Sequence, residues 1–431
     1  MQGALRGVIG ILGFGVDGQC VAEFLEKQTE VREVRVFEAR MDNGQWTMDN
    51  EQLKKGVTLE GVALLFRSPG FPLTHPLVQE AREKGIPITS STTYFLEHFR
   101  GKTVGITGSN GKTTCTTLVA EMLRVEFGKE NVEEGGNDRK PRLDLLGLRT
   151  KDYGQGIPSL KSQVSSLSYV VLELSSFQLI DSPVSPNVAV VLNLTPNHLD
   201  WHASMEEYAE AKRQIVAHQK KGDVAILNKA DPIVKIFAKG LKSTVRWFDE
   251  DIPFDEILCK THPDTIRAAV TAARVCGVSE ENIRKVLRTF PGVSHRIEFV
   301  RELEGVKWYN DSSCTTPESA IIACNAFEPG TLILLLGGRD KKMDFSKLYE
   351  VIKERNVQVI PYGEQAQVFL KNLPTSYRLQ ATSSFEEVIS AASTLAKPGD
   401  NVVLSPACAS FDMFKNAKER GKIFEELVRN L

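Results

Sequence analysis

Short apolar runs alternate with amphipathic segments along almost the whole chain. Apolar runs of four to six residues are typical of strands buried in a parallel sheet, whereas the segment 19–28 and the one that starts at Lys112 predict helices. The predicted strands are 7–12, 33–37, 63–66, 103–107, 169–174, 188–192, 224–227, 332–336, 357–361 and 401–404. This alternation predicts an α/β fold with parallel sheets.

The length of the chain indicates how many domains these elements form. At roughly 150 residues per domain, 431 residues predict about three. A second α/β unit starts near residue 103, and Pro291-Gly292 precedes a third. We therefore expect domains over 1–98, 99–291 and 292–431. The segment Gly135–Ser168 is rich in Gly, Ser, Lys and Arg, which predicts a long surface excursion.

Composition and charge exclude several classes of protein. Hydrophobic residues at 42% and charged residues at 25% argue against disorder, collagen and coiled coil. A net charge of −2 gives no reason to expect nucleic acid or an anionic membrane as partner. Seven cysteines without a CxxC pair, and no apolar run of about 20 residues, predict a cytoplasmic protein that does not span a membrane.

The first glycine-rich loop follows the first predicted strand. Gly13 to Gly18 reads GxGxxG, and Glu38 stands at the end of the next strand, twenty residues further on. This spacing is typical of a loop that holds a pyrophosphate at a helix N-terminus, with an acid on a ribose hydroxyl. The alternative is a tight turn without a ligand. The nucleotide that would carry the pyrophosphate stays open.

The second loop, Gly105 to Thr114, predicts a triphosphate site. It is not a strict Walker A motif, because Ile106 stands where the first glycine would be. Gly108 and Gly111 still permit a nest of backbone N–H groups, Lys112 can reach the β- and γ-phosphates, and Thr113 can bind Mg²⁺. Together the two loops argue against a dehydrogenase, because hydride transfer has no use for a triphosphate.

Acidic and imidazole side chains follow the next two strands. Glu173 ends one predicted strand, and His198 follows the next, so both should lie at the carboxyl edge of one sheet. A surface carboxylate capping the following helix, and a structural histidine, are the alternatives. We expect Asp200 and His202 to stabilise the loop. In isolation, Lys212 reads as an exposed lysine on a helix that begins with a capping box at Ser204.

Several motifs in combination resemble the Mur ligases, and among them the branch that adds D-glutamate. The resemblance covers essentially the whole chain, and 405–410 (SPACAS) is among its most specific parts. The motifs that carry it are 107–114, 173–178, the His198 loop, His295-Arg296, 310–312 and 404–412. The resemblance implies a Rossmann-like N-terminal domain for the UDP end of the substrate, a central P-loop ATPase domain and a C-terminal dinucleotide-fold domain for the amino acid.

The resemblance also implies residue roles at the ATP site. ATP would be held by Gly108, Ser109, Asn110, Gly111, Lys112, Thr113, Thr114, Arg296 and Asp311. Two Mg²⁺ ions are implied, with Thr113, Glu173 and His198 as ligands, and Lys112, Glu173, His198 and Lys212 are implied as the catalytic residues. Lys212 falls at the family's N-carbamoylated lysine, where a CO₂-derived carbamate would bind the second ion.

The implied substrates are UDP-N-acetylmuramoyl-L-alanine and D-glutamate, joined through an acyl phosphate. The nucleotide substrate would contact Val16, Asp17, Gly18, Glu38, Arg40, Ser68, Gly70, Asn137 and Ser175. The amino acid would contact Thr315, Lys341, Ser410 and Phe411. We expect these small molecules to be the partners of a monomer.

Four positions or segments depart from the family pattern. Ser313 replaces a lysine and Ala417 a phenylalanine, both in the acceptor region. Asparagines expected near the adenosine are absent from 262–266, and the segment 135–168 is longer than expected. Loss of the lysine charge predicts that D-glutamate is accepted together with some other D-amino acid.

Three alternatives to this ligase stay open at this point. A nicotinamide-dependent oxidoreductase would use the Gly13 loop but leave Lys112 and Thr113 idle. A P-loop NTPase switch or binding module would leave the Gly13 loop and Asp311 unexplained. Folylpolyglutamate synthetase shares the central domain but lacks an N-terminal nucleotide domain of this kind.

Overall fold

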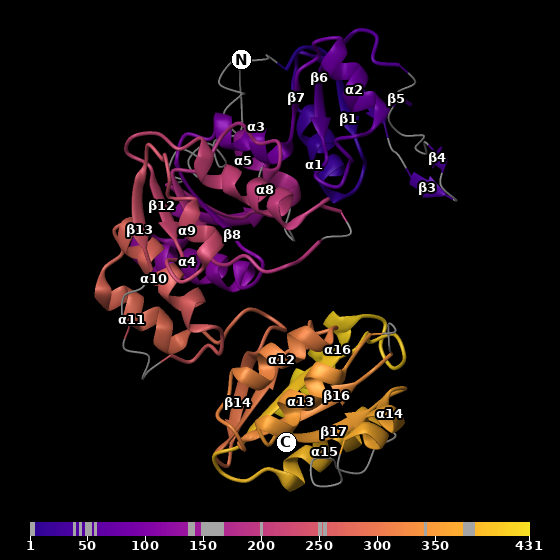
Figure 1. The fold of residues 1–431 in the computed structure, drawn as a ribbon, viewed down its shortest axis with the longest axis vertical. Helices are drawn as coiled ribbons and strands as arrows, with labels where there is room; N and C mark the ends of the chain where they lie inside the picture. Colours follow the sequence, from indigo (N-terminus) through magenta and orange to yellow (C-terminus); the bar gives the residue numbers. More distant parts are fainter. Residues whose placement is uncertain are drawn as a thin grey trace, which may run out of the picture. The chain divides into compact units, whose positions relative to one another are not determined.

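The structure of the chain is a computed structural model. It describes residues 5–37, 40–42, 45–47, 54–55, 58–136, 143–147, 168–198, 201–248, 252, 257–339, 343–373 and 384–431. The chain folds into two compact units. The first comprises Met1–Ile252 and Asp264–Ile283, and the second comprises Pro253–Pro263 and Arg284–Leu431. Three α/β sheets follow one another along the chain, two in the first unit and one in the second (Figure 1).

The first sheet is parallel, with strand order β5-β2-β1-β6-β7. Ile9 and Ile11 face a core shared with Val21 on one side, whereas Leu12 and Leu65 pack with Val78 on the other. Its elements are β1 (Gly7–Leu12), α1 (Val16–Leu25), β2 (Val31–Phe37), β5 (Lys54–Lys55), β6 (Val62–Arg67), α2 (Pro76–Glu83), β7 (Ile88–Thr89) and α3 (Ser91–His98), with β3 (Arg40–Asp42) and β4 (Gln45–Thr47) as a separate antiparallel pair.

The second sheet is also parallel, in the order β13-β12-β11-β8-β10-β9. Strand β8 therefore lies between β11 and β10, so the loops that follow these three strands meet at one edge. The elements are β8 (Lys102–Thr107), α4 (Lys112–Phe127), η1 (Lys129–Asn131), β9 (Val132–Gly136), α5 (Asp144–Gly147), β10 (Tyr169–Glu173), α7 (Ser176–Leu179), β11 (Val188–Val191), α8 (Met205–Ala217), β12 (Val224–Leu227), α9 (Pro232–Ile236), β13 (Thr244–Trp247), α10 (Pro263–Val275) and α11 (Glu280–Thr289).

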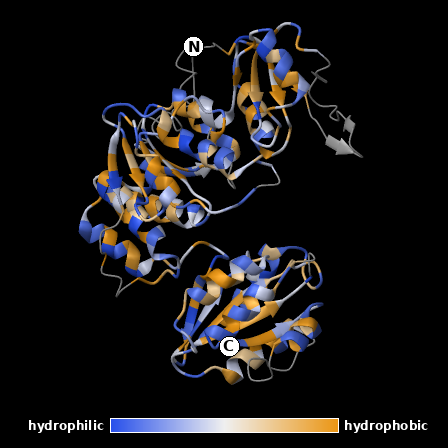
Figure 2. Ribbon diagram, viewed as in Figure 1, coloured by the Kyte–Doolittle hydropathy of each residue, from blue (hydrophilic) through white to orange (hydrophobic). Residues whose placement is uncertain are grey.

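The third sheet has the order β14-β15-β18-β16-β17, and only the pair β14–β15 is antiparallel. Leu334 and Leu336 face one core, and Ile333 and Leu335 face the other. The elements are β14 (Glu298–Leu303), β15 (Val306–Asn310), α12 (Pro317–Asn325), β16 (Leu332–Gly337), α13 (Ser346–Glu354), β17 (Gln358–Tyr362), α14 (Ala366–Asn372), α15 (Phe385–Leu395), β18 (Asn401–Ala407) and α16 (Ala417–Arg429). Hydrophobic residues concentrate along the strands in all three sheets (Figure 2).

The predicted α/β class and the ten predicted strands are confirmed, with ends that shift by at most three residues. The surface excursion predicted from Gly135 is wrong at its start, because Gly135 and Gly136 are buried in β9. Leu143, further along that segment, is only 1% exposed. Over the described residues, none of the helices combines the length and apolar character that crossing a bilayer requires.

Candidate active site

The loop between β8 and α4 has the backbone of a phosphate-binding turn. Gly108 and Gly111 have φ of 157° and 82°, which side chains rarely adopt. A Cβ atom on Gly111 would lie 2.6 Å from the Thr265 hydroxyl, so that close approach also requires glycine. The helix α4 starts directly at Lys112, and its first N–H groups and positive dipole end can therefore face an anion.

Hydrogen bonds connect this loop, the P-loop, to the segment 193–195 that follows β11. The Ser109 hydroxyl donates to the carbonyl of Thr195 and accepts from its N–H, both at 2.9 Å. The Asn110 N–H donates to the side chain of Asn193 at 2.9 Å. The Lys112 ammonium donates to the carbonyls of Gly108 and Ser109 at 3.1 and 3.0 Å, so it lies over its own loop. Thr113 and Thr114 occupy the first turn of α4.

Glu173 lies at the carboxyl end of β10, beside the P-loop strand. Its side chain is buried, and Ser175, not Glu173, caps α7 through a capping box with Gln178. The alternative of a surface carboxylate that caps this helix is therefore wrong. A Cβ atom on Gly136 would lie 2.0 Å from the Glu173 carbonyl oxygen, so the close approach of β9 to the end of β10 requires glycine at this position.

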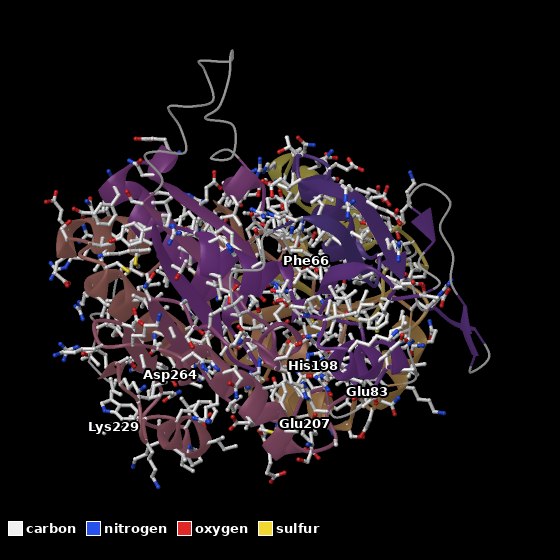
Figure 3. All side chains as sticks on the ribbon, turned by 90° about the horizontal axis from the view of Figure 1, so that it is seen from above. Phe66, Glu83, His198, Glu207, Lys229 and Asp264 are labelled. Atoms are coloured by element: carbon white, nitrogen blue, oxygen red, sulfur yellow. The ribbon has the colours of Figure 1, made fainter. Side chains whose placement is uncertain are left out.

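His198 follows β11 on the other side of the P-loop strand. It is exposed and has a φ of 54°. The centre of its ring lies 5.1 Å from the centre of the Phe177 ring, and Phe177 belongs to α7, the helix that comes after Glu173. Figure 3 labels His198 together with Glu207 of α8. The buried His202 instead contacts the Ser176 hydroxyl at 2.9 Å, as expected of a loop-stabilising residue, while Asp200 lies outside the described residues.

Lys212 is the residue whose environment differs most from the expectation. It is 2% exposed, so the interpretation as a surface lysine is wrong. Its ammonium donates to Thr107 Oγ1 at 3.2 Å and lies 4.9 Å from the centre of the Tyr208 ring. Burial lowers the pKa of Lys212 well below its usual range, the positive Lys112 lowers it further, and Glu173 opposes the shift.

The helix α8 carried a sequence signal for this burial. Tyr208, Lys212 and Ile215 follow at spacings of four and three residues, which places them on one face of the helix. All three are buried. The sequence motifs indicate no role for Tyr208, but its hydroxyl lies 3.1 Å from Ser109 Oγ and links the P-loop to this helix.

The Gly13 loop follows the central strand of the first sheet. The Ser68 hydroxyl donates to the Gly13 carbonyl at 2.8 Å, and a Cβ atom on Gly18 would lie 2.2 Å from that same oxygen. Asp17 accepts a hydrogen bond from Ser91, and burial raises the pKa of Asp17 to about 6. Val16 and Gly70 are exposed near the same strand ends. The side chains of Glu38, Arg40 and Asn137 lie outside the described residues.

Asp311 is the buried acid of the second unit. Its carboxylate accepts from the Ser405 hydroxyl at 2.6 Å and from the Ile297 N–H at 3.3 Å. Burial raises the pKa of Asp311 to about 7, although these hydrogen bonds and the nearby Arg296 oppose the shift. The sequence-predicted pair of Arg296 and Asp311 is thus brought together, with Arg296 exposed.

The predicted acceptor residues lie around the ends of β16 and β18. The N–H of Arg339, after β16, donates to the carbonyl of Ala409, after β18, at 2.8 Å. Ser410 is buried, Thr315 is half-buried and Phe411 is 60% exposed, while Lys341 lies outside the described residues.

Comparisons with known proteins identify the family of the chain. Residues 106–257 match the model of the Mur ligase middle domain, and residues 295–408 match the model of the Mur ligase, glutamate ligase domain. The UDP-N-acetylmuramoylalanine–D-glutamate ligase of Acidobacterium capsulatum is 35% identical over 97% of this chain and 95% of its own. The chain belongs to the Mur ligase family. Membership makes it an ATP-dependent ligase that forms carbon–nitrogen bonds, which favours the ligase hypothesis over the oxidoreductase and the NTPase switch.

Other relatives of this Mur ligase carry the same name. The UDP-N-acetylmuramoylalanine–D-glutamate ligase of Clostridium perfringens is 33% identical over 98% of this chain and 96% of its own. Among solved structures, the MurF ligase of Thermotoga maritima in complex with ADP is 17% identical and covers 99% of this chain and 96% of its own, with a TM-score of 0.57. At that identity the structural likeness concerns the fold alone.

One buried arginine of this Mur ligase was missed in the sequence. Arg420 is 0% exposed and donates to the Ser312 hydroxyl at 2.9 Å, the Ser312 carbonyl at 2.8 Å and the Cys408 carbonyl at 3.2 Å. It therefore joins the segment after Asp311 to the SPACAS segment. Because its partners lie 12 and 108 residues away, no local pattern could have indicated this role.

Proposed function

We propose that this Mur ligase adds D-glutamate to UDP-N-acetylmuramoyl-L-alanine in the synthesis of the peptidoglycan precursor. The observation that carries the proposal is the edge of the second sheet, where Lys112 of the P-loop and Glu173 both act electrostatically on the buried Lys212. This edge occurs in a chain whose relatives of similar length are named D-glutamate ligases. We further propose a monomer in the cytoplasm, with small molecules, and neither nucleic acid nor membrane, as its partners.

The ATP site would be built on the P-loop. Residues 108–114 would hold the triphosphate, with Lys112 at the γ-phosphate, and Arg296 and Asp311 would complete the site from the third α/β part. The Thr113 hydroxyl and the Glu173 carboxylate are oxygen donors of the kind that Mg²⁺ prefers, and His198 would add an imidazole nitrogen. When bound, two such ions would offset the charge of a carboxylate that approaches a triphosphate.

The environment of Lys212 supports a carbamate there. Only a neutral amine adds CO₂, and burial beside a second cation favours the neutral form of Lys212. The product is a carboxylate, which would supply oxygen ligands where an ammonium would repel a metal ion. Thr107, which now accepts from the amine, would remain within hydrogen-bonding reach of the modified side chain.

The nucleotide substrate would extend from the first sheet towards the P-loop. Its diphosphate end would lie at Val16, Asp17, Gly18, Ser68 and Gly70, with Glu38 and Arg40 around the base. Asn137 and Ser175 would contact the lactoyl-alanine part. We also propose domain boundaries at 1–98, 99–291 and 292–431, which assign one of the three sheets to the UDP end, one to ATP and one to the amino acid.

The reaction would proceed in two steps. The terminal carboxylate of the nucleotide substrate attacks the γ-phosphorus, and ADP leaves, which gives an acyl phosphate. The amine of D-glutamate, positioned by Thr315, Lys341, Ser410 and Phe411, then attacks the acyl carbon, and phosphate leaves from the tetrahedral intermediate. Lys112 would stabilise negative charge in the first step.

Phosphate release tests the proposed reaction. We expect ATP to yield phosphate only when UDP-N-acetylmuramoyl-L-alanine and D-glutamate are both present, because the acyl phosphate needs the first and its breakdown needs the second. The measurement is coupled phosphate release, with omission of each substrate in turn. Phosphate release that ignores the nucleotide substrate, or NADH turnover without ATP, would contradict the proposal.

The acceptor region predicts relaxed selectivity. Ser313 stands where the family has a lysine, and a charge-assisted contact of that kind contributes about 1.5–3 kcal/mol when it is buried against a bound substrate. We expect at least one of D-Lys, D-Asp and D-Gln to support phosphate release, and Ser313→Lys to raise the preference for D-glutamate by about tenfold or more. Ser313→Met is the control of similar length without the charge. Activity with D-glutamate alone would refute relaxed selectivity.

A further inference from the structure

Arg67 is a completely buried arginine at the last position of β6. Its Nη1 donates to the carbonyls of Ser68, Pro69 and Phe71 at 3.2, 3.1 and 3.0 Å. Its Nε and Nη2 form a bidentate pair with the Asp181 carboxylate at 2.8 and 2.7 Å. One side chain thus holds the whole turn after β6 and reaches a carboxylate 114 residues away.

The partner carboxylate belongs to the second α/β part. Asp181 comes two residues after α7, the helix that Ser175 caps and that directly follows the strand carrying Glu173. Nη2 of Arg67 also donates to the carbonyl of Phe177 within α7 at 3.4 Å. Arg67 therefore ties the turn of the first sheet to the helix beside the P-loop edge of the second sheet.

A second contact joins the same two regions. The Gln178 side chain in α7 donates to the Thr92 hydroxyl in α3 at 3.2 Å. A buried guanidinium is costly unless its donors are satisfied. Every nitrogen of Arg67 has an acceptor, and Asp181 supplies the opposite charge with 26% of its side chain exposed. The arrangement is therefore a rigid link rather than a surface ion pair.

We propose that Arg67 is a positioning residue for the nucleotide substrate. It shapes the 68–70 turn that would hold the diphosphate, and through Asp181 it sets the distance between that turn and the P-loop edge. This inference rests on the proposed function, in which a UDP-linked carboxylic acid is held at one end and reacts at the other. Such a substrate is sensitive to that distance, because a misplacement of about 1 Å can lower a rate about a hundredfold.

The test compares Arg67→Lys and Arg67→Met with the wild-type protein. Lysine keeps the charge but cannot form a bidentate pair and also hold three carbonyls, and methionine keeps only the length. We expect kcat/KM for UDP-N-acetylmuramoyl-L-alanine to fall about ten- to a hundredfold, with KM raised and methionine worse than lysine. The KM for ATP should stay within about twofold, because the P-loop keeps its own contacts.

Two further variants separate positioning from folding. Arg355→Lys removes another arginine that donates to backbone carbonyls, those of Cys324 and Phe327 in the second unit, and should leave KM for the nucleotide substrate unchanged. Asp181→Asn keeps an acceptor but removes the charge, and should raise that KM less than Arg67→Met. If Arg67→Met cannot be purified folded, Arg67→Lys and Asp181→Asn still decide.

The outcomes distinguish this inference from the proposed function. If the activity lost in the Arg67 variants only matches their loss of folded protein, and the KM for the nucleotide substrate is unchanged, Arg67 only supports folding and the inference is overturned. A wild-type protein that releases no phosphate with the nucleotide substrate and D-glutamate would overturn the proposed function instead. Calorimetry with UDP alone adds an independent measurement, in which the Arg67 variants should bind more weakly than wild type and Arg355→Lys should bind equally.

Discussion

Replacing Lys212 with alanine is expected to lower the rate of phosphate release about 10²–10³-fold, the loss typical of removing one group that stabilises transition-state charge. The substitution would remove the only side chain on α8 that reaches Thr107 in the described contacts, and with it the proposed carbamate. Formate or acetate should restore part of the activity by placing a carboxylate in the vacated space. The measurement is phosphate release with both substrates, with and without the added acid.

Lys220→Ala is the matched control, because Lys220 is an exposed lysine just after the same helix. It should leave the rate unchanged with or without formate. The carbamate itself is checked by a ¹³C signal after incubation with labelled bicarbonate, present in wild type and absent in Lys212→Ala. Full activity of Lys212→Ala would contradict a catalytic role. A loss that no short acid restores, together with no carbamate signal in wild type, would refute the carbamate.

The lowered pKa of Lys212 also gives the sign of a pH effect. Protonation removes the neutral amine that reacts with CO₂, so activity should fall as pH drops through the pKa of this lysine. Because burial and Lys112 lower that pKa, the fall should occur at a lower pH than for an ordinary lysine.

Local patterns predicted the apolar buried strands and the two glycine loops well. A strand such as β12 coincides with its apolar run, Val224–Leu227, because a strand buried on both faces needs no other signal. The P-loop is equally local, since its glycines, Lys112 and Thr113 are adjacent in sequence. The strand β9 was missed because its sequence, VEEGG, is not apolar, and it forms by pairing with β10.

Contacts between distant residues account for what sequence could not supply. Arg67 and Asp181 are 114 residues apart, and nothing near either residue indicates the other. Lys212 is a partial exception, because its place on the face of Tyr208 and Ile215 indicated burial. A lysine has strong prior odds of exposure, which outweighed that pattern. The catalytic role of Lys212, which depends on its burial, was therefore indicated by the resemblance to the Mur ligases and not by composition or by a local motif.

The stability of the folded chain should depend on pH through Asp311. Burial raises the pKa of Asp311 from 3.8 to about 7 in the folded chain, so the folded state holds this proton more tightly than the unfolded state between those values. The free energy of unfolding should therefore fall as pH rises from about 4 to about 7 and level off above. At roughly 1.4 kcal/mol per pKa unit, the loss from this group reaches about 4 kcal/mol.

Asp311→Asn should remove this slope and make the protein more stable than wild type at pH 8, as measured by urea-denaturation midpoints of the full chain across this pH range. Asp344→Asn is the control of opposite sign, because hydrogen bonds from Ser346 lower the pKa of the exposed Asp344. At the proposed ATP site the same change should cost activity, since an amide cannot supply the negative charge. If the denaturation midpoint of the wild type rose with pH relative to that of Asp311→Asn, the raised pKa of Asp311 would be contradicted. If Asp311→Asn is more stable but less active than the wild type, Asp311 is a charge kept buried for function at the expense of folding.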